Sequence, residues 1–359
     1  MLPVQFVLYG ELERRNQLRL TREESRFLRD RSDPFGLTDR RFVEIFRLSK
    51  ELVRFLFDEL QELMEDGVRA SRIHYQQRIL VGLRFYAIGS YQRAVGQEYL
   101  VAVSQPMVSR CIEEVATVIV QHFGNEWIKF PTDAQEVVRK KREFFESCGI
   151  PGTIGAIDCT HIRIISPKAE EHAYMNRKGY HSMNVQLICD TNLFIVNVNS
   201  SFPGSCHDSY IWQQSVIQTY LQNSYRNGDR NTWLLGDSGY PQQPWLMTPV
   251  PGAQPNSPEE RFNQAHASGR NHIERTNGVL KSRFRCIMGE RELRYEPPKV
   301  CILVNACCIL HNMCIRSRVP LLEIIEGNEQ NDNNHEVLDL PIDNGGRQTR
   351  TTLINRYFQ

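Results

Sequence analysis

The hydrophobic periodicity of the chain changes near residue 150, and this change limits what the chain can fold into. Before it, apolar residues recur at helical spacing, as in residues 41–60 (RFVEIFRLSKELVRFLFDEL) and 78–90 (RILVGLRFYAIGS). After it come short apolar or alternating runs at 152–157, 161–165, 183–189, 193–199 and 233–241. Helical patterns return at 209–222 and 271–285. Strands flanked by helices predict an α/β fold, here preceded by an all-α region.

The all-α region contains a candidate helix-turn-helix. Residues 92–123 (QRAVGQEYLVAVSQPMVSRCIEEVATVIVQHF) predict two helices joined by a short turn at VAVSQP. Ser104 is a suitable N-cap, and Pro106 suits a first helical turn. The second helix of such a pair could enter the major groove of DNA. From the pattern alone, a plain helical bundle is the more common explanation.

Four acidic residues follow strand-like runs or open helical patterns, with small or turn-forming neighbours. They are Asp158 (GAIDCT), Asp208 (GSCHDSY), Asp237 (LLGDSGY) and Glu274 (NHIERTNG). The carboxyl ends of strands in an open α/β sheet line one crevice, so we expect three of the four acids to meet there. Ordinary roles remain open for three of them: an N-cap for Asp208, a turn for Asp237 and a helix-dipole interaction for Glu274. Asp158 is the hardest to explain in this way, because the strand-like pattern continues beyond it.

Convergence of these acids would predict a metal site. Four carboxylates in one crevice would repel one another and raise their pKa values unless a cation neutralised them. Mg²⁺ and Mn²⁺, hard ions that prefer oxygen ligands, meet that need. Two ions about 3.5–4 Å apart would activate a water or hydroxyl on one side of a phosphodiester and stabilise the leaving oxygen on the other. His161 and His207 are candidates for orienting a carboxylate or a phosphate.

The charge distribution is compatible with a polyanionic partner. Residues 323–343 contain seven acids and no Lys or Arg, so the rest of the chain carries +8 although the whole carries +1. Residues 261–299 contain nine Lys or Arg and four acids. A phosphate backbone could use this surplus, although such runs are usually solvated helix faces. The RKKREFF segment at 139–145 fits either a surface helix or a nuclear-localisation signal.

Ten cysteines without a CxxC pair predict reduced thiols in an intracellular protein rather than a zinc ribbon. Cys308, His311 and Cys314 have helical spacing, but they lie in the apolar stretch VCILVNACCILHNMCI, which favours core packing over a metal site. The apolar stretch at the N-terminus is too short to span a membrane and lacks the flanks of a signal peptide. We therefore expect no membrane association.

Several of these segments together resemble the PIF/Harbinger transposases, and most closely their domesticated animal relatives, the Harbinger transposase-derived nucleases. The resemblance extends over nearly the whole chain, and its most specific part is the linked set GAIDCTHIRI, FPGSCHDS, GDSGYP, NHIERTNGVLKSRFRC and ACCILHN. It implies an RNase H-like core with a DDE metal site. Asp158 and Asp237 match the two aspartates and Glu274 the glutamate, while Asp208 matches a fourth acid usually counted with the metal ligands.

The resemblance also implies a partner. Proteins of this family rely on a separate Myb/SANT-like protein for DNA recognition and nuclear entry, so we expect such a partner and a location in both nucleus and cytoplasm. Phosphoryl transfer at two element ends would suit a homodimer.

We therefore expect four regions: an N-terminal helical region (1–70), a helix-turn-helix-like region (71–148), an RNase H-like DDE nuclease domain (149–322) and an acidic, disordered C-terminal tail (323–359). The expected activity is cleavage, and potentially transfer, of DNA phosphodiester bonds by a divalent-metal-dependent endonuclease. One alternative is a catalytically vestigial, DNA-bound scaffold that acts with the Myb/SANT-like partner. A weaker alternative is a metallohydrolase of small phosphoesters.

Overall fold

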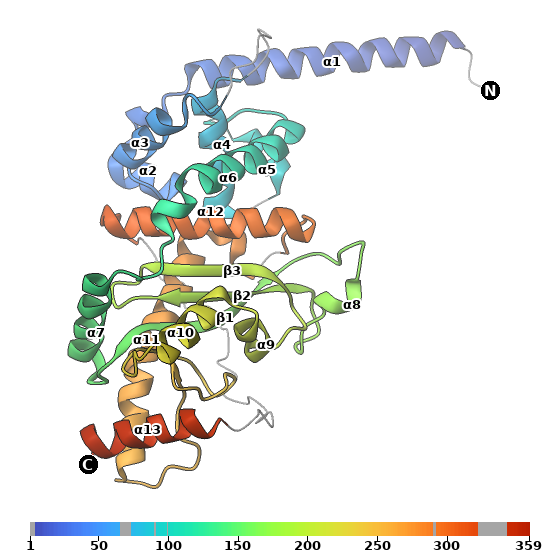
Figure 1. The fold of residues 1–359 in the computed structure, drawn as a ribbon. Coiled ribbons are helices and arrows are strands. Elements are labelled where there is room, and N and C mark those ends of the chain that lie inside the picture. Colours follow the sequence, from blue (N-terminus) through green and yellow to red (C-terminus); the bar gives the residue numbers. More distant parts are fainter. Residues whose placement is uncertain (1–3, 65–72, 90, 99, 290–291, 322–342) are drawn as a thin grey trace. The chain divides into compact units, whose positions relative to one another are not determined.

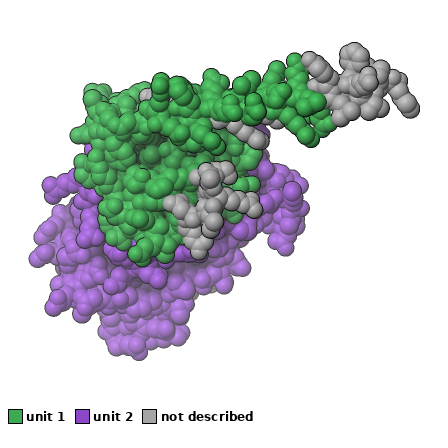
Figure 2. Space-filling model, turned by 90° about the horizontal axis from the view of Figure 1, so that it is seen from above, with its two compact units in different colours: residues 1–118 green, residues 119–359 purple. Residues whose placement is uncertain are grey.

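The computed structural model describes residues 4–64, 73–89, 91–98, 100–289, 292–321 and 343–359 (Figure 1). The chain divides into two compact units, residues 1–118 and 119–359 (Figure 2). This division lies between the boundaries expected at residues 70 and 148.

The first unit is all-α within its described residues. Its helices are α1 (Val4–Arg31), the 3₁₀ turn η1 (Pro34–Gly36), α2 (Asp39–Phe46), α3 (Lys50–Leu60), α4 (Tyr75–Ile88), α5 (Gln92–Gln97) and most of α6 (Gln105–Trp127). The single helix expected at 41–60 is two helices, because Arg47 ends α2 in the left-handed conformation and the Ser49 side chain caps α3 by accepting from the Leu52 N–H. Ser104 directly precedes α6, as expected, but α5 has only six residues. A DNA-binding role for α5 and α6 stays a prediction.

The second unit is α/β. Its strands are β1 (Thr153–Arg163), β2 (Ser182–Cys189), β3 (Ile195–Pro203), β4 (Trp233–Leu235) and β5 (Leu246–Met247). Its helices are α7 (Ala134–Cys148), α8 (Glu171–Tyr174), α9 (Asp208–Gln213), α10 (Val216–Arg226), α11 (Pro258–Arg283), the 3₁₀ turn η2 (Arg285–Ile287), α12 (Pro297–Arg316) and α13 (Asn344–Tyr357).

The five strands form one mixed sheet in the order β3-β2-β1-β4-β5. β1, β2 and β3 are antiparallel neighbours, whereas β4 runs parallel to both β1 and β5. The expected β2–β3 hairpin is confirmed, and the Asp190 carboxylate closes its turn by accepting from the Asn192 and Phe194 N–H groups. This order and these directions are consistent with an RNase H-like core.

Alternate side chains of β4 pack on opposite faces of the sheet, as the strand period requires. Leu234 belongs to a cluster with Trp212 and Leu221 of α9 and α10. Trp233 and Leu235 belong to a second cluster with Phe262 of α11 and with α13. The sheet is therefore covered by helices on both faces, with α11 on the α13 side.

α12 lies along β3 (Figure 1). Cys308, His311 and Cys314 are all buried in it, as expected for core packing, and His311 Nε2 lies 2.8 Å from the Leu193 carbonyl. Among the described helices, α12 is long and apolar enough to cross a membrane, but 67% of its most apolar stretch is buried inside the protein. It therefore packs as a core helix.

Four further expectations need correction. The runs at 152–157 and 161–165 contribute to one continuous strand, β1, which begins at Thr153 and ends at Arg163. The helix expected at 209–222 is interrupted at Ser215, whose side chain caps α10 by accepting from the Ile217 N–H. The helix expected at 271–285 begins much earlier, at the capping residue Ser257.

The fourth correction concerns the C-terminal tail. Residues 322–342 lie outside the described residues, whereas Asn344–Tyr357 form α13. Leu353 and Ile354 of α13 are buried against the second unit, because the apolar end of the chain has a core cluster to join.

Candidate active site

The four predicted acids occupy three layers of the second unit. Asp158 lies within β1 rather than at its end, because the strand continues to Arg163. Asp237 lies two residues beyond β4, and Asp208 is the first residue of α9. Glu274 lies inside α11 rather than at its start. The acids therefore come from two neighbouring strands and from helices on either side of them.

Sheet register brings Asp158 and Asp237 to the same level. In the parallel pair β1–β4, Ala156 lies opposite Leu235, and each aspartate follows two residues later. Asp158 is still inside β1 and Asp237 lies just beyond the end of β4, so the register brings the two aspartates close to each other on neighbouring segments.

Gly269 lets α11 approach the sheet closely. A Cβ atom at this position would lie 2.4 Å from the Leu235 Cδ1 and 3.2 Å from the Cys148 Sγ. Glycine inside a helix costs about 1 kcal/mol relative to alanine, and here it permits contact of α11 with β4 and α7. Glu274 follows slightly more than one turn later, so this contact sets its height above β1.

Charge effects on Asp158 indicate that the four acids converge. The pKa of the Asp158 carboxyl is raised to about 7, first because burial disfavours its charged form. The nearby Arg270 guanidinium opposes this effect, and the negative charges of Asp237, Asp208 and Glu274 add to it. The structure thus brings all four predicted site residues into one electrostatic cluster.

Neutral donors fix three of the carboxylates. Asn277 Nδ2 of α11 donates to Asp158 Oδ2 at 3.2 Å, and Asn184 Nδ2 of β2 donates to Asp208 Oδ1 at 3.0 Å. The Gly239 N–H donates to Asp237 Oδ1 at 3.0 Å. The Asp237 bond is the turn contact anticipated for an ordinary aspartate. The N-cap role considered for Asp208 is wrong, since His207 is the N-cap of α9.

Arg270 is the cation closest to the cluster by these contacts. Its Nη2 lies 3.6 Å from Asp158 Oδ1 and its Nη1 lies 3.5 Å from Glu274 Oε1. The guanidinium therefore bridges an acid of the central strand and an acid of α11.

The donor set fits a hard divalent ion in its chemistry. It offers four carboxylates, and a cation would offset both the burial and the nearby negative charges that raise the pKa of Asp158. Among the residues that the structure describes, no three His, Cys, Asp or Glu side chains are already arranged to hold a metal ion. The acids are thus gathered but not yet in a coordinating arrangement.

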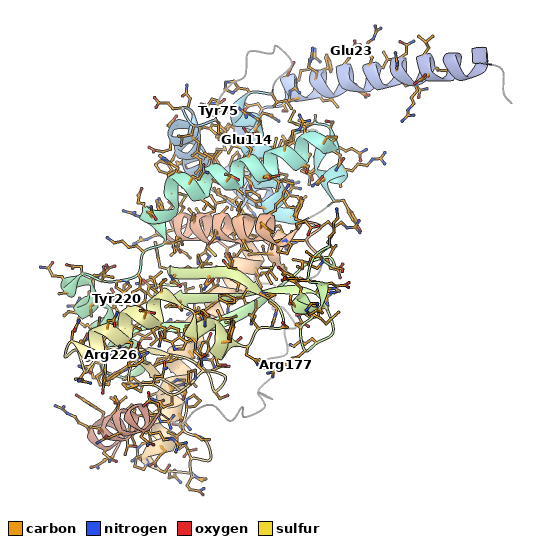
Figure 3. The ribbon with its side chains drawn as sticks, turned by 45° about the vertical axis from the view of Figure 1, so that its right-hand side comes forward. Glu23, Tyr75, Glu114, Arg177, Tyr220 and Arg226 are labelled. Carbon is orange, nitrogen blue, oxygen red and sulfur yellow. The ribbon has the colours of Figure 1, made fainter. Side chains whose placement is uncertain are left out.

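The two candidate histidines have other contacts. His161 Nδ1 lies 3.0 Å from the Ser182 hydroxyl. His207 bonds to the guanidinium of Arg177, which precedes β2 and is labelled in Figure 3. His207 still adjoins Asp208 in the chain, so its expected orienting role stays a prediction.

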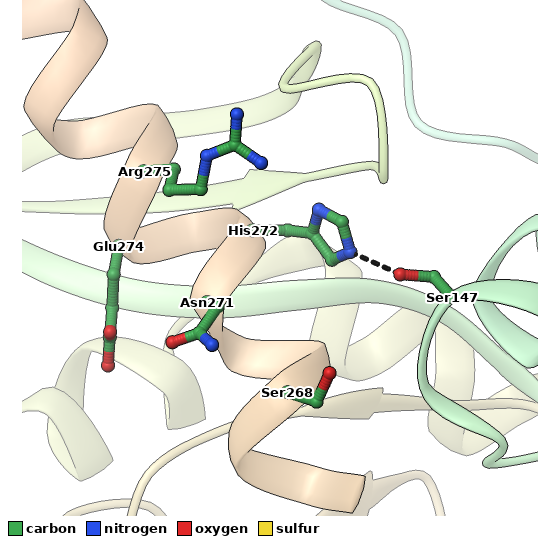
Figure 4. A pocket seen from close by; sticks show the side chains of 6 residues that line it. All are labelled: Ser147, Ser268, Asn271, His272, Glu274 and Arg275. Carbon is green, nitrogen blue, oxygen red and sulfur yellow. Dashed lines mark hydrogen bonds between the residues drawn. The ribbon is translucent and has the colours of Figure 1, made fainter.

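An open hollow of about 300 Å³ adjoins Glu274 on α11 (Figure 4). The residues that line it are Ser147, Ser268, Asn271, His272, Glu274 and Arg275. His272 Nε2 lies 2.7 Å from the Ser147 hydroxyl, which links α11 to the end of α7. The hollow therefore presents mainly polar groups beside one of the acids.

Sequence reasoning missed the residues that hold the acids: Asn184, Arg270 and Asn277. Arg270 and Asn277 lie four residues before and three residues after Glu274, so helical periodicity alone places all three on one face. That signal was available in the sequence. Asn184 could not be found in this way, because its contact with Asp208 depends on tertiary folding.

Comparison with known proteins assigns the region that contains the four acids to a protein family. Residues 157–312, which include all four acids, match the family described as "DDE superfamily endonuclease". The chain is 34% identical over 323 residues to "Putative nuclease HARBI1" of Bos taurus, covering 88% of this chain and 90% of that protein. The Homo sapiens protein of the same name is 33% identical, with 88% and 90% covered.

A plant protein is also similar. The chain is 25% identical over 329 residues to "Protein ALP1-like" of Arabidopsis thaliana, with 84% of this chain and 77% of that protein covered. No solved structure matches the chain.

Proposed function

Because the chain belongs to the family of Harbinger transposase-derived nucleases, we propose that its second unit is a divalent-metal-dependent DNA endonuclease. The observation that carries this proposal is the convergence of Asp208, Asp237 and Glu274 on the largely buried Asp158. A carboxylate inside a central strand, with three more acids around it, is unfavourable unless the site serves to bind cations.

Asp158, Asp237 and Glu274 would hold Mg²⁺ or Mn²⁺, with Asp208 as an added ligand. Such ions supply an activated water or hydroxyl and stabilise the leaving oxygen of a phosphodiester. The protein's own contribution is orientation. Asn277, Asn184 and the Gly239 N–H hold the carboxylate oxygens that they contact, which limits the rearrangement needed for metal binding.

Neutralising individual acids tests this function. We expect Asp158→Asn, Asp237→Asn and Glu274→Gln each to lower Mn²⁺-dependent nicking of supercoiled DNA by at least about 10²-fold, because each removes a ligand of the ions that would stabilise charge at the reacting phosphate. Calorimetry on the same variants without DNA should show loss of Mn²⁺ binding.

Glu146→Gln is the matched control. Glu146 is an exposed acid of α7 that pairs with Arg142, so its neutralisation should leave nicking and Mn²⁺ binding unchanged. Full nicking activity in Asp158→Asn would contradict the proposal.

The competing function is a catalytically vestigial, DNA-bound scaffold that acts with a Myb/SANT-like partner. The family resemblance supports such a partner for either function, and with it a location in both nucleus and cytoplasm. Neutralising all four acids distinguishes the two functions. If DNA-dependent partner binding and the biological role both survive this change, the scaffold function is correct.

A further inference from the structure

Arg270 forms ion pairs with two of the acids that would have to bind the metal ion. Its two terminal nitrogens lie within 3.6 Å of Asp158 and 3.5 Å of Glu274. Within the described residues, these two acids are its only ion-pair partners. A planar guanidinium can face two carboxylates at once, which a single ammonium cannot do with the same geometry.

The surroundings of Arg270 strengthen its ion pair with Asp158 more than its ion pair with Glu274, whose side chain is 37% exposed. The Arg270 side chain is only 18% exposed, Asp158 is 19% exposed, and the Arg270 Nε atom is buried without a hydrogen-bond partner. Charges that are largely withdrawn from water interact more strongly and are less screened by salt than surface pairs. Among the charges acting on Asp158, the guanidinium is the favourable one and the three acids are unfavourable.

Together these contacts point to a specific role. We propose that Arg270 is a built-in counter-ion that holds Asp158 and Glu274 while no metal is bound and competes with the divalent ion for them. This inference rests on the proposed metal site and goes beyond it. It makes Arg270 a residue that keeps the acids gathered but weakens metal binding, because its contact with the carboxylates must be broken first.

Whether Mn²⁺ binding becomes tighter or weaker when Arg270 is replaced tests this competition. In calorimetry without DNA, Arg270→Gln should bind Mn²⁺ about tenfold more tightly than the native chain, since the ion no longer displaces a cation. The same variant should melt at a lower temperature than the native chain without metal, and Mn²⁺ should raise its melting temperature by more. If Arg270 instead positions the acids for the ion, Arg270→Gln should bind Mn²⁺ more weakly than the native chain. That result would overturn the proposal.

Arg275→Gln is the matched control. Arg275 is on the same helix and lines the hollow beside Glu274, and the described residues include no ion pair between it and an acid. Removing its charge should change Mn²⁺ affinity by less than about twofold, because the screened charge acts from further away. An equal tightening in both variants would show a general charge effect and would also overturn the proposal.

Arg270→Lys keeps the test decisive if Arg270→Gln does not fold. Lysine keeps the positive charge but lacks the planar guanidinium that faces both carboxylates. We therefore expect this variant to bind Mn²⁺ a few-fold more tightly than the native chain. Unchanged or weaker binding by this variant would overturn the inference. An Arg270→Gln chain that folds only with Mn²⁺ would support it, because the two cations would then be interchangeable.

Failure of the metal site itself would look different. If neither the native chain nor the Arg270 variants bind Mn²⁺, the proposed function fails and this inference fails with it. If the native chain binds Mn²⁺ and Arg270→Gln binds it more weakly, only the inference fails.

Discussion

A carboxylate in the middle of a central strand is held in place by its neighbours rather than by solvent. Asp158 accepts a hydrogen bond from Asn277 and faces the Arg270 guanidinium, yet burial still raises its pKa to about 7. An ionised group in this position is destabilising unless more positive charge arrives. The residue is therefore better suited to binding a cation than to stabilising the fold.

The burial of His266 predicts how the stability of the protein depends on pH. It lies on α11, is 2% exposed, and its Nε2 is 3.0 Å from the Met247 carbonyl. Burial lowers its pKa from 6.5 to about 4. The unfolded chain therefore binds a proton more readily than the folded chain over that range. The contribution of His266 to the free energy of unfolding is therefore complete above pH 6.5. It is lost as the pH falls toward 4, by about 1.4 kcal/mol per pH unit.

Urea unfolding at several pH values would measure this contribution. His266→Gln keeps a donor for the Met247 carbonyl but cannot be protonated, so its free energy of unfolding should depend less on pH between 6.5 and 4. An identical pH dependence in both chains would show that His266 does not titrate as its burial requires.

The sequence predicts which acids form the candidate site better than it predicts where they lie within their strands and helices. The motifs and the family resemblance predict all four acids, and the structure brings them together. Their local positions were partly wrong, since Asp158 does not end a strand and Glu274 does not begin a helix. A polar residue inside a strand interrupts the apolar pattern, so the sequence does not show that the strand continues beyond it. The first half of α11 is polar, so hydrophobic periodicity does not show where the helix begins.

At the scale of elements, α11 has two different faces. One face carries Arg270, Glu274 and Asn277 toward Asp158, and Gly269 allows the close packing that brings them there. The other side carries Asn271 and Arg275 along the open hollow (Figure 4). A DNA strand whose phosphate reaches the acids would therefore pass a cationic, hydrogen-bonding surface on the same helix.

The second face predicts a DNA contact. We expect Arg275→Ala to weaken binding of a DNA duplex several-fold and to reduce the salt dependence of log K by about 0.9, the value for one lost phosphate contact. Fluorescence anisotropy at a series of salt concentrations, without divalent ions, would measure both quantities.

Arg142→Ala provides the control for this prediction. Arg142 is an exposed residue of α7 that pairs with Glu146. Its removal should change the salt dependence less than that of Arg275. Equal effects of the two substitutions would place the DNA elsewhere.

At the scale of the whole chain, the second unit depends on its last helix. α13 packs Leu353 and Ile354 against Trp233, Met247 and Phe262. Arg350 donates to the carbonyls of Thr248 and Pro249, and Gln242 Nε2 donates to the Gly346 carbonyl at 3.0 Å. The LINRYF end is apolar enough to pack against the protein, but its partner surface is formed by segments about one hundred residues earlier, which no local pattern identifies.

Leu353→Ala should therefore destabilise the protein by about 2–4 kcal/mol, because it leaves a cavity in a closed cluster. Thr351→Ala, an exposed change on the same helix, should alter the free energy of unfolding by less than about 0.5 kcal/mol. Chemical denaturation of both variants tests this difference. Similar small effects would mean that α13 is attached only loosely.

The docking of α13 also has a consequence for synthesis. A ribosome releases a chain from its N-terminus, so α13 emerges well after the strands and α11. Until then, the apolar surface formed by Trp233, Met247 and Phe262 lacks its cover. This cluster is thus completed late in synthesis, so a product truncated before α13 would carry the acidic residues without the finished scaffold that holds them.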